Sequence, residues 1–294
     1  MSNIKSYLKL HFIIFIWGFT AVLGALIQLN YLVLTWYRMG LASLFLFLFL
    51  MIKKARRQDF FKFEIKKQAR YVLGGIIIAM HWLAFFYAIK VSNVSITLLT
   101  MSSGAFFTSL LEPIFYKRKI LFYEILFGLL ILLGFIVLLQ IEKIEFTGVY
   151  FALIAAFLSG LFSVINGIYV QHENAFKLSF FELFYGFLFL TITMLFSGDL
   201  QNLPMPTTTD WIYILLLASI CTAYAFTISI DIMRFLSPFT VMLSINLEPV
   251  YGIILAVLLL GDKEVMSTNF YIGSLIILII IALNSVVKNY SKRN

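Results

Sequence analysis

Long apolar runs constrain this chain more than any other feature of its sequence. Its 294 residues are 62% hydrophobic and only 12% charged, which is more apolar surface than a soluble protein of this size can bury. The apolar residues fall in runs of about 20, the length needed to cross roughly 30 Å of hydrocarbon. We predict ten membrane-spanning segments: 8–28, 32–52, 71–89, 94–116, 121–140, 147–169, 179–197, 211–230, 238–260 and 268–287.

Each of these segments should be an α-helix, because backbone amides cannot remain unpaired in lipid. The positions of Lys and Arg predict their direction. If the N-terminus is cytoplasmic, 18 basic residues fall in cytoplasmic segments, eight of them in the loop 53–70, and only three fall in outer segments. We therefore expect an all-α, multi-pass protein of the inner or plasma membrane with both termini in the cytoplasm. Because the net charge of +8 lies beside the spans, it indicates a lipid bilayer rather than nucleic acid as partner.

The chain also repeats itself at an offset of 145 residues. This offset carries Gly104 onto Pro249 and Gly128 onto Gly273. Each half contains five spans, and an odd number of spans inverts the second half relative to the first. We expect two inverted five-helix repeats, 1–145 and 146–294, with helix breaks at Gly104 and Pro249. Inverted repeats with weakened helices at matched positions are typical of secondary transporters.

Polar groups deep in the membrane are costly, so each is a functional candidate. Glu248 lies about ten residues into its span, roughly 15 Å deep and near the midplane. Pro249 removes a backbone donor beside it, and Asn246 adds an amide in the same turn. Ser103 lies next to Gly104 in the matched span. These residues predict a polar, substrate-binding patch, in which Glu248 could bind a ligand or a proton. The alternative is that Glu248 has only a structural role at a broken helix.

Further candidates lie at similar depth on other spans. His81 could bind substrate or relay protons, or it could simply bond one neighbouring carbonyl. Trp17 and Trp82 could stack on a planar or cationic ligand, although aromatic residues in such a chain also serve packing. Three residues on expected cavity helices could hydrogen-bond a substrate: Asn166, Tyr185 and Tyr224.

Two charged residues occupy pseudo-symmetric positions. Arg38 lies near the outer side of its span, where it could attract an anionic substrate group or extend to the headgroups. Glu182 occupies the matched place near the cytoplasmic side. We predict that Arg38 and Glu182 are gate residues at the two mouths. Glu112, near the cytoplasmic end of its span, should reach the cations at 117–119.

The sequence offers little for catalysis or metal binding. His11, His81 and His172 lie at different depths, and the lone cysteine is Cys221, so we expect no metal site and no cofactor. Intramembrane enzymes need paired acids or a nucleophile–base pair at one depth, and we find neither. No Walker A motif is present, so the chain should not itself use ATP. A transporter is the leading hypothesis, with a membrane sensor or structural protein as the alternative and an enzyme less favoured.

Several motifs resemble those of the drug/metabolite transporter superfamily, in particular the EamA-type permeases. The resemblance extends over 8–287 and rests on Trp17-Gly18, on Trp36-Tyr37-Arg38, and on Asn-Leu-Glu-Pro-Val at 246–250 followed by Leu-Leu-Leu-Gly-Asp at 258–262. The turn that begins at Gly261 departs from the family pattern at Asp262. The corresponding turn of the first half, 116–119, lacks both the glycine and the acid.

The resemblance implies a central cavity lined by spans 1–4 and 6–9, with spans 5 and 10 peripheral, and it implies alternating access. The expected function is therefore secondary transport, as an exporter, of a small metabolite such as an amino acid or other amphipathic compound, with proton coupling as an added hypothesis. Gly128 and Gly134 in span 5, with Gly273 in span 10, would permit close helix approach. A homodimer could form through these peripheral helices.

Overall fold

The computed structural model describes residues 2–52, 64–119, 125–126, 129–130, 133 and 145–291, and the architecture below refers to these residues. They form helices and contain no strand. Most of the predicted span 121–140, including Gly128 and Gly134, lies outside them, so the tenth helix and its proposed dimer face stay predictions.

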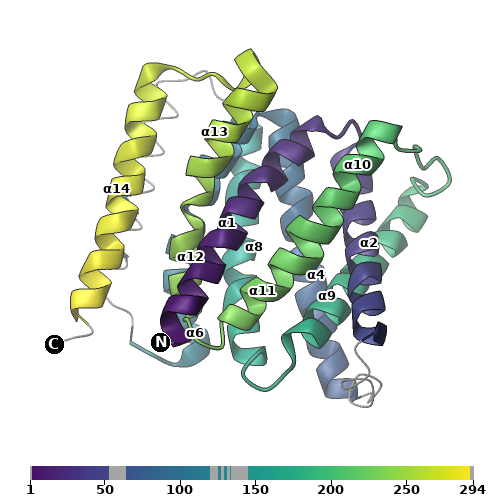
Figure 1. Cartoon of the computed structure of the whole chain (residues 1–294), viewed down its shortest axis with the longest axis horizontal. Helices are drawn as coiled ribbons and strands as arrows, with labels where there is room; N and C mark the ends of the chain where they lie inside the picture. Colours follow the sequence, from purple (N-terminus) through teal and green to yellow (C-terminus); the bar gives the residue numbers. More distant parts are fainter. Residues whose placement is uncertain are drawn as a thin grey trace.

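The helices follow one another along the chain as labelled in Figure 1. Their order is α1 (Ser2–Leu26), α2 (Tyr31–Ile52), α4 (Ile65–Val91), α5 (Val94–Met101), α6 (Gly104–Tyr116), α8 (Phe146–Tyr169), α9 (Ala175–Ser197), α10 (Thr208–Leu216), the π-helix η2 (Leu217–Tyr224), α11 (Ala225–Ile232), α12 (Pro238–Ile245), α13 (Glu248–Leu260), the 3-10 turn η3 (Gly261–Glu264) and α14 (Thr268–Ser291).

Eight helical segments within the described ranges are long and apolar enough to cross a membrane: 4–26, 31–52, 65–91, 94–116, 146–169, 175–197, 208–232 and 238–260. The helix α14, of 24 residues, is a ninth. The helix α4 begins at Ile65, six residues before the predicted span, because its first turns carry Lys66, Lys67 and Arg70 and extend beyond the apolar run.

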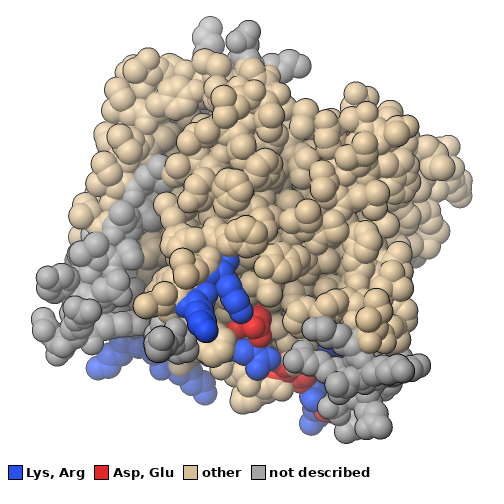
Figure 2. All heavy atoms as spheres, in the orientation of Figure 1, with Lys and Arg blue, Asp and Glu red and all other residues tan. Residues whose placement is uncertain are grey.

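The helices run side by side as one bundle (Figure 1). The helix α1 begins and α14 ends at the same end, and α14 stands at the edge. On the face shown in Figure 2, charged side chains gather at this end, and the described residues on the surface above it are uncharged. We call it the basic end and its opposite the far end. This distribution agrees with the predicted cytoplasmic orientation of the termini, which itself stays a prediction.

Two of the spans are interrupted halfway. The first consists of α5 and α6, with Gly104 as the first residue of α6, and the second consists of α12 and α13, with Pro249 as the second residue of α13. At both breaks an amide donates to the carbonyl three residues earlier, as in a 3-10 turn, instead of four residues earlier. The Ser102 amide donates to Leu99 O at 3.1 Å, and the equivalent Leu247 amide donates to Ser244 O at 3.0 Å. The two breaks therefore have related backbone geometry at positions 145 residues apart.

The two halves pack into one another rather than side by side. In one direction, α4 of the first half packs on α8 and α9 of the second half. In the other direction, η2 and α11 of the second half pack on α1, and η2 also packs on α2. The second set of contacts is the repeat-related equivalent of the first. Small residues allow the closest approaches. A Cβ atom at Gly18 of α1 would lie 2.9 Å from Tyr251 Cβ of α13, and one at Gly160 of α8 would lie 2.8 Å from Thr108 Oγ1 of α6. These contacts bring both broken spans against the centre.

Candidate functional site

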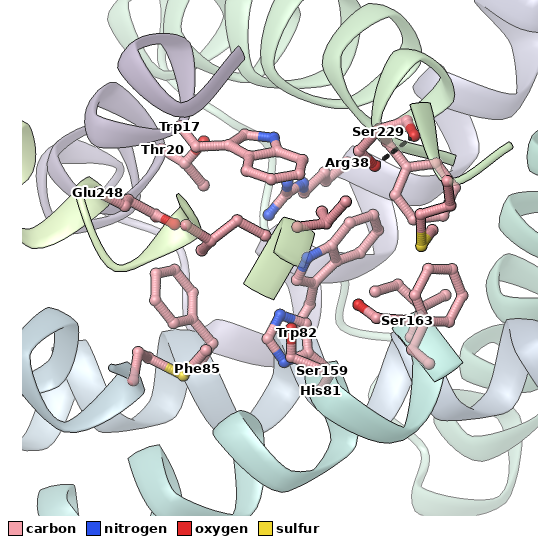
Figure 3. A pocket seen from close by; sticks show the side chains of 17 residues that line it. Trp17, Thr20, Arg38, His81, Trp82, Phe85, Ser159, Ser163, Ser229 and Glu248 are labelled. Atoms are coloured by element: carbon pink, nitrogen blue, oxygen red, sulfur yellow. Dashed lines mark hydrogen bonds between the residues drawn. The ribbon is translucent and has the colours of Figure 1, made fainter. Parts of the chain in front are cut away.

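A central cavity of about 90 Å³ lies between the halves (Figure 3). Its walls come from α1, α2, α4, α8, α11, α12, the end of α5 and the first residue of α13. Five predicted binding residues line it: Trp17, Arg38, His81, Trp82 and Glu248. The helix α9 of the seventh span contributes no residue to this lining, although the resemblance implied that spans 6–9 all take part.

Arg38 is the most constrained of these residues. Its side chain is 2% exposed, and its Nε donates to Thr222 Oγ1 at 2.7 Å. The guanidinium carbon lies 3.8 Å from the ring centroid of Trp82, a close cation–π contact. Its Nη1 has no hydrogen-bond partner among the described residues. Arg38 is therefore held rigidly while keeping a free, buried donor.

The π-helix η2 supplies the atoms that hold this corner. Thr222 Oγ1 donates to the Leu217 carbonyl five residues earlier, at 2.7 Å. Trp17 Nε1 donates to the Cys221 carbonyl at 3.0 Å. A π-helical turn widens the backbone and is often found at functional sites. The apolar run of this span gave no signal of the distortion.

Glu248 provides the opposite charge in the same cavity. It is the first residue of α13, so its carboxyl stands directly at the helix break. Figure 3 shows the Glu248 carboxyl and the Arg38 guanidinium both directed into the space between them. The guanidinium and the carboxyl lie within electrostatic range of one another. Thr20, beside them, has an Oγ1 with no hydrogen-bond partner among the described residues. The cavity thus presents a cation, a carboxyl and a hydroxyl to any ligand.

Aromatic rings form the remaining wall. The ring of Trp82 lies 5.7 Å from that of Phe226, which lies 5.3 Å from that of Phe162. His81 Nδ1 lies 2.8 Å from the Ala155 carbonyl. Because a carbonyl only accepts, Nδ1 carries the proton in this contact. The wall could receive a flat or apolar group. His81 both lines the cavity and bonds one neighbouring carbonyl, so both predicted alternatives describe part of its position.

Four predicted binding residues lie elsewhere. Asn246 lines a smaller hollow, with Ser102 and Pro249, next to Glu248. Ser103 is fully buried and donates to Thr100 O at 2.8 Å. Tyr185 donates to Gln68 Oε1 at 2.6 Å, toward the basic end. Tyr224, at the end of η2, is 46% exposed. None of the four lines the central cavity, because the rotation of their helices directs them elsewhere.

Asn166 and Glu182 form a separate group. Both are fully buried, on α8 and α9, and neither lines the central cavity. The two predicted gate residues therefore lie in different surroundings in this structure. Arg38 faces the cavity, and Glu182 lies in a helix interface outside it.

Three serines that line the cavity are not among the predicted site residues: Ser159, Ser163 and Ser229. Ser159 and Ser163 are four residues apart on α8, so they lie on one helix face. This spacing was a usable signal, because hydroxyls on one face of an apolar span indicate a polar lining.

Comparisons with known proteins agree with this architecture. The sequence matches the EamA-like transporter family over residues 5–140 and again over residues 146–286. One solved crystal structure shares the fold with a TM-score of 0.73, at 15% identity and with 97% of this chain and 98% of that chain covered. A search of curated protein sequences found no significant match. The resemblance seen in the motifs is thus confirmed, and the chain belongs to the EamA-like transporter family, whose members are membrane transporters.

Proposed function

We propose that this protein is a secondary transporter that exports a small amphipathic metabolite, such as an amino acid, across the inner or plasma membrane. One observation carries the proposal: Arg38 and Glu248 face a single aromatic-lined cavity, and Arg38 keeps an unpartnered Nη1 donor. A ligand carboxylate would accept from Arg38, and a ligand ammonium would lie beside Glu248. The ligand side chain would pack against Trp82 and Phe162.

Alternating access would use the two broken spans. Both breaks lie at mid-span, and Glu248 belongs to one of them, so a movement of α12 against α13 would change the cavity directly. The equivalent movement of α5 against α6 would act from the opposite end. Half-helices of this kind are the usual moving parts around a midplane site.

A ligand screen by thermal stability tests the proposal on purified protein in detergent. The panel contains amino acids, nucleotide metabolites, polyamines and cationic dyes. A ligand that binds only the folded state stabilises it by about 2.7 kcal/mol at a hundredfold excess over Kd. We expect stabilisation by a zwitterion that carries an apolar or aromatic group.

Three variants locate the bound ligand. Arg38→Gln and Glu248→Gln should each abolish the stabilisation, because each removes one of the two complementary charges. Glu64→Gln is the control, since Glu64 is exposed and pairs with Lys67 on the surface. Stabilisation that survives in both cavity variants would contradict the proposed site. A ligand that needs Glu248 but not Arg38 would indicate a simple cation in place of a zwitterion.

A further inference from the structure

We infer that Glu182 is a proton-binding site, separate from the central cavity, that couples transport to a proton gradient. The inference deepens the proposed function, and its claim of coupling to transport rests on that function. The binding site itself rests on the surroundings of one carboxyl group between α4, α8 and α9.

The first observation is the isolation of this carboxyl. Glu182 is fully buried, and neither of its two oxygens has a hydrogen-bond partner among the described residues. An ionised carboxylate in an apolar interior requires a cation or several donors to offset its lost hydration. Glu182 has no cation beside it within the described residues, and the side-chain amide of Asn166 is the polar group next to it, so the neutral, protonated acid is the form that fits.

The second observation is how tightly the helix α4 encloses it. A Cβ atom at Gly74 would lie only 2.1 Å from Glu182 Oε1, and one at Gly75 would lie 2.5 Å from the Glu182 carbonyl oxygen. The Gly74-Gly75 step therefore makes the space that the carboxyl occupies. Because the carboxyl rests directly on the α4 backbone, it has room for a proton but little for a hydrated metal ion.

The third observation is an acceptor that lacks a donor. Asn166 lies beside Glu182, where its Nδ2 could donate to the ionised carboxyl, and its Oδ1 is without a partner among the described residues. A protonated carboxyl has one O–H donor, which could serve Asn166 Oδ1. One proton on Glu182 would then satisfy two buried groups that the ionised form leaves unpaired.

Two polar groups, Tyr71 and Glu173, lie between this site and the basic end. Tyr71 of α4 lies within electrostatic range of Glu182, and its hydroxyl donates to Glu173 Oε2 at 3.2 Å. Glu173 pairs with Lys67 at 3.1 Å, and both lie close to the surface. A proton taken from water at the basic end would bind Glu173 and pass to the Tyr71 oxygen. The original Tyr71 hydroxyl proton would move to Glu182 as the two side chains approach, so Tyr71 stays neutral and Glu182 gains its O–H bond.

The other titratable groups around α9 do not neutralise Glu182. Tyr169 of α8 is within electrostatic range but carries no positive charge. The guanidinium of Arg70 of α4 lies over the Tyr169 ring, 5.4 Å from its centroid. Arg38 of α2 is bound to Thr222 and faces the cavity. Asp231 of α11 pairs with Arg234 at 3.2 Å. Glu182 would lose its proton when water reaches the carboxyl during the transport cycle.

Infrared spectroscopy of the purified protein tests the binding site without any substrate. The wild type should show the carbonyl stretch of a protonated carboxyl that disappears in Glu182→Gln and persists in Glu64→Gln. Asn166→Ala should shift the frequency of this band by removing its hydrogen-bond acceptor, an effect that a merely structural residue would not produce. A wild-type spectrum that Glu182→Gln leaves unchanged would overturn the inference.

Proteoliposomes test the coupling, with radiolabelled phenylalanine as the probe. The ratio of uptake with a pH gradient to uptake without one should fall to about one in Glu182→Gln. It should remain high in the control Glu145→Gln, because the Glu145 side chain is exposed and makes no cap hydrogen bond. A sodium gradient that replaces the pH gradient would contradict the inference. Absence of phenylalanine exchange in the wild type would count against the proposed function, while the infrared result would still decide whether Glu182 binds a proton.

Discussion

The half-helices α5 and α12 begin at opposite ends of the bundle, and each has its N-terminus bound by a glutamate of the other half. At the far end, Glu264 accepts from the amides of Val94 and Ser95, both at 3.0 Å. At the basic end, Glu112 accepts from the Phe239 amide at 2.8 Å. Val94 and Phe239 are 145 residues apart, so equivalent backbone donors are satisfied in the same way.

The glutamates themselves are not equivalent. The offset carries Glu112 onto Val257 and Glu264 onto Lys119. Glu112 also accepts from Arg118 Nε at 3.2 Å, which confirms the prediction that it reaches the cations at 117–119. Glu264 instead accepts its third hydrogen bond from the Ser95 hydroxyl at 3.1 Å. The repeat therefore reproduces a backbone requirement, because free amides at a helix N-terminus need an acceptor. The side chains that meet this requirement differ between the ends.

Glu264→Gln should have the largest effect on stability. The amide keeps one acceptor oxygen but places an NH₂ group opposite a backbone N–H of Val94 or Ser95, both of which are buried. We expect the free energy of unfolding to fall by about 2–3 kcal/mol, the cost of leaving a buried donor facing another donor. Thermal unfolding in detergent measures it. A loss no larger than that of an exposed control such as Glu64→Gln would show that the cap is not needed.

Glu112→Gln should have an intermediate effect. The glutamine oxygen can still accept from Phe239, and the NH₂ group replaces only the oxygen that faces Arg118. We expect a fall of about 1–2 kcal/mol in the free energy of unfolding, measured under the same conditions. A larger loss than for Glu264→Gln would reverse the proposed order of the two ends.

Arg118→Gln should have the smallest effect. The Arg118 side chain is 26% exposed, so water screens its pairing with Glu112. We expect a change of about 0.5 kcal/mol in the free energy of unfolding, which added salt would reduce further. If Arg118→Gln instead matched Glu112→Gln, the ion pair rather than the helix cap would stabilise the basic end.

The fold was largely predictable because its main signals are local. Apolar length placed the helices, and Gly104 and Pro249 lie at the starts of α6 and α13. The caps were not predictable. Glu264 and Val94 are 170 residues apart, and no local pattern reports a contact that only the packing of the two halves creates.

The cavity was predictable in part. Depth along the spans identified Arg38 and Glu248, which face one another. Depth could not distinguish them from Glu182 or Tyr224, because in a uniformly apolar helix the periodicity does not fix which side faces inward. The π-helical distortion of η2, which positions Thr222 to hold Arg38, could not be predicted from the sequence, because it depends on how the neighbouring helices pack.

Alternating access predicts that the two caps restrain opposite ends, and the lone cysteine of the chain can report this. Cys221 is 3% exposed, and its Sγ donates to the Ile16 carbonyl of α1 at 3.7 Å, near the cavity. A membrane-impermeant thiol reagent can be applied to one side of sealed vesicles and then, separately, to the other. The variants Glu264→Ala and Glu112→Ala release one cap each.

The most direct test is therefore the sidedness of Cys221 labelling in these two variants. We predict that Glu264→Ala increases labelling from one side of the membrane and Glu112→Ala increases it from the opposite side, with the wild type slow from both. Faster labelling of both variants from the same side, or no change in either, would contradict the account of two caps that hold opposite ends closed around one central cavity.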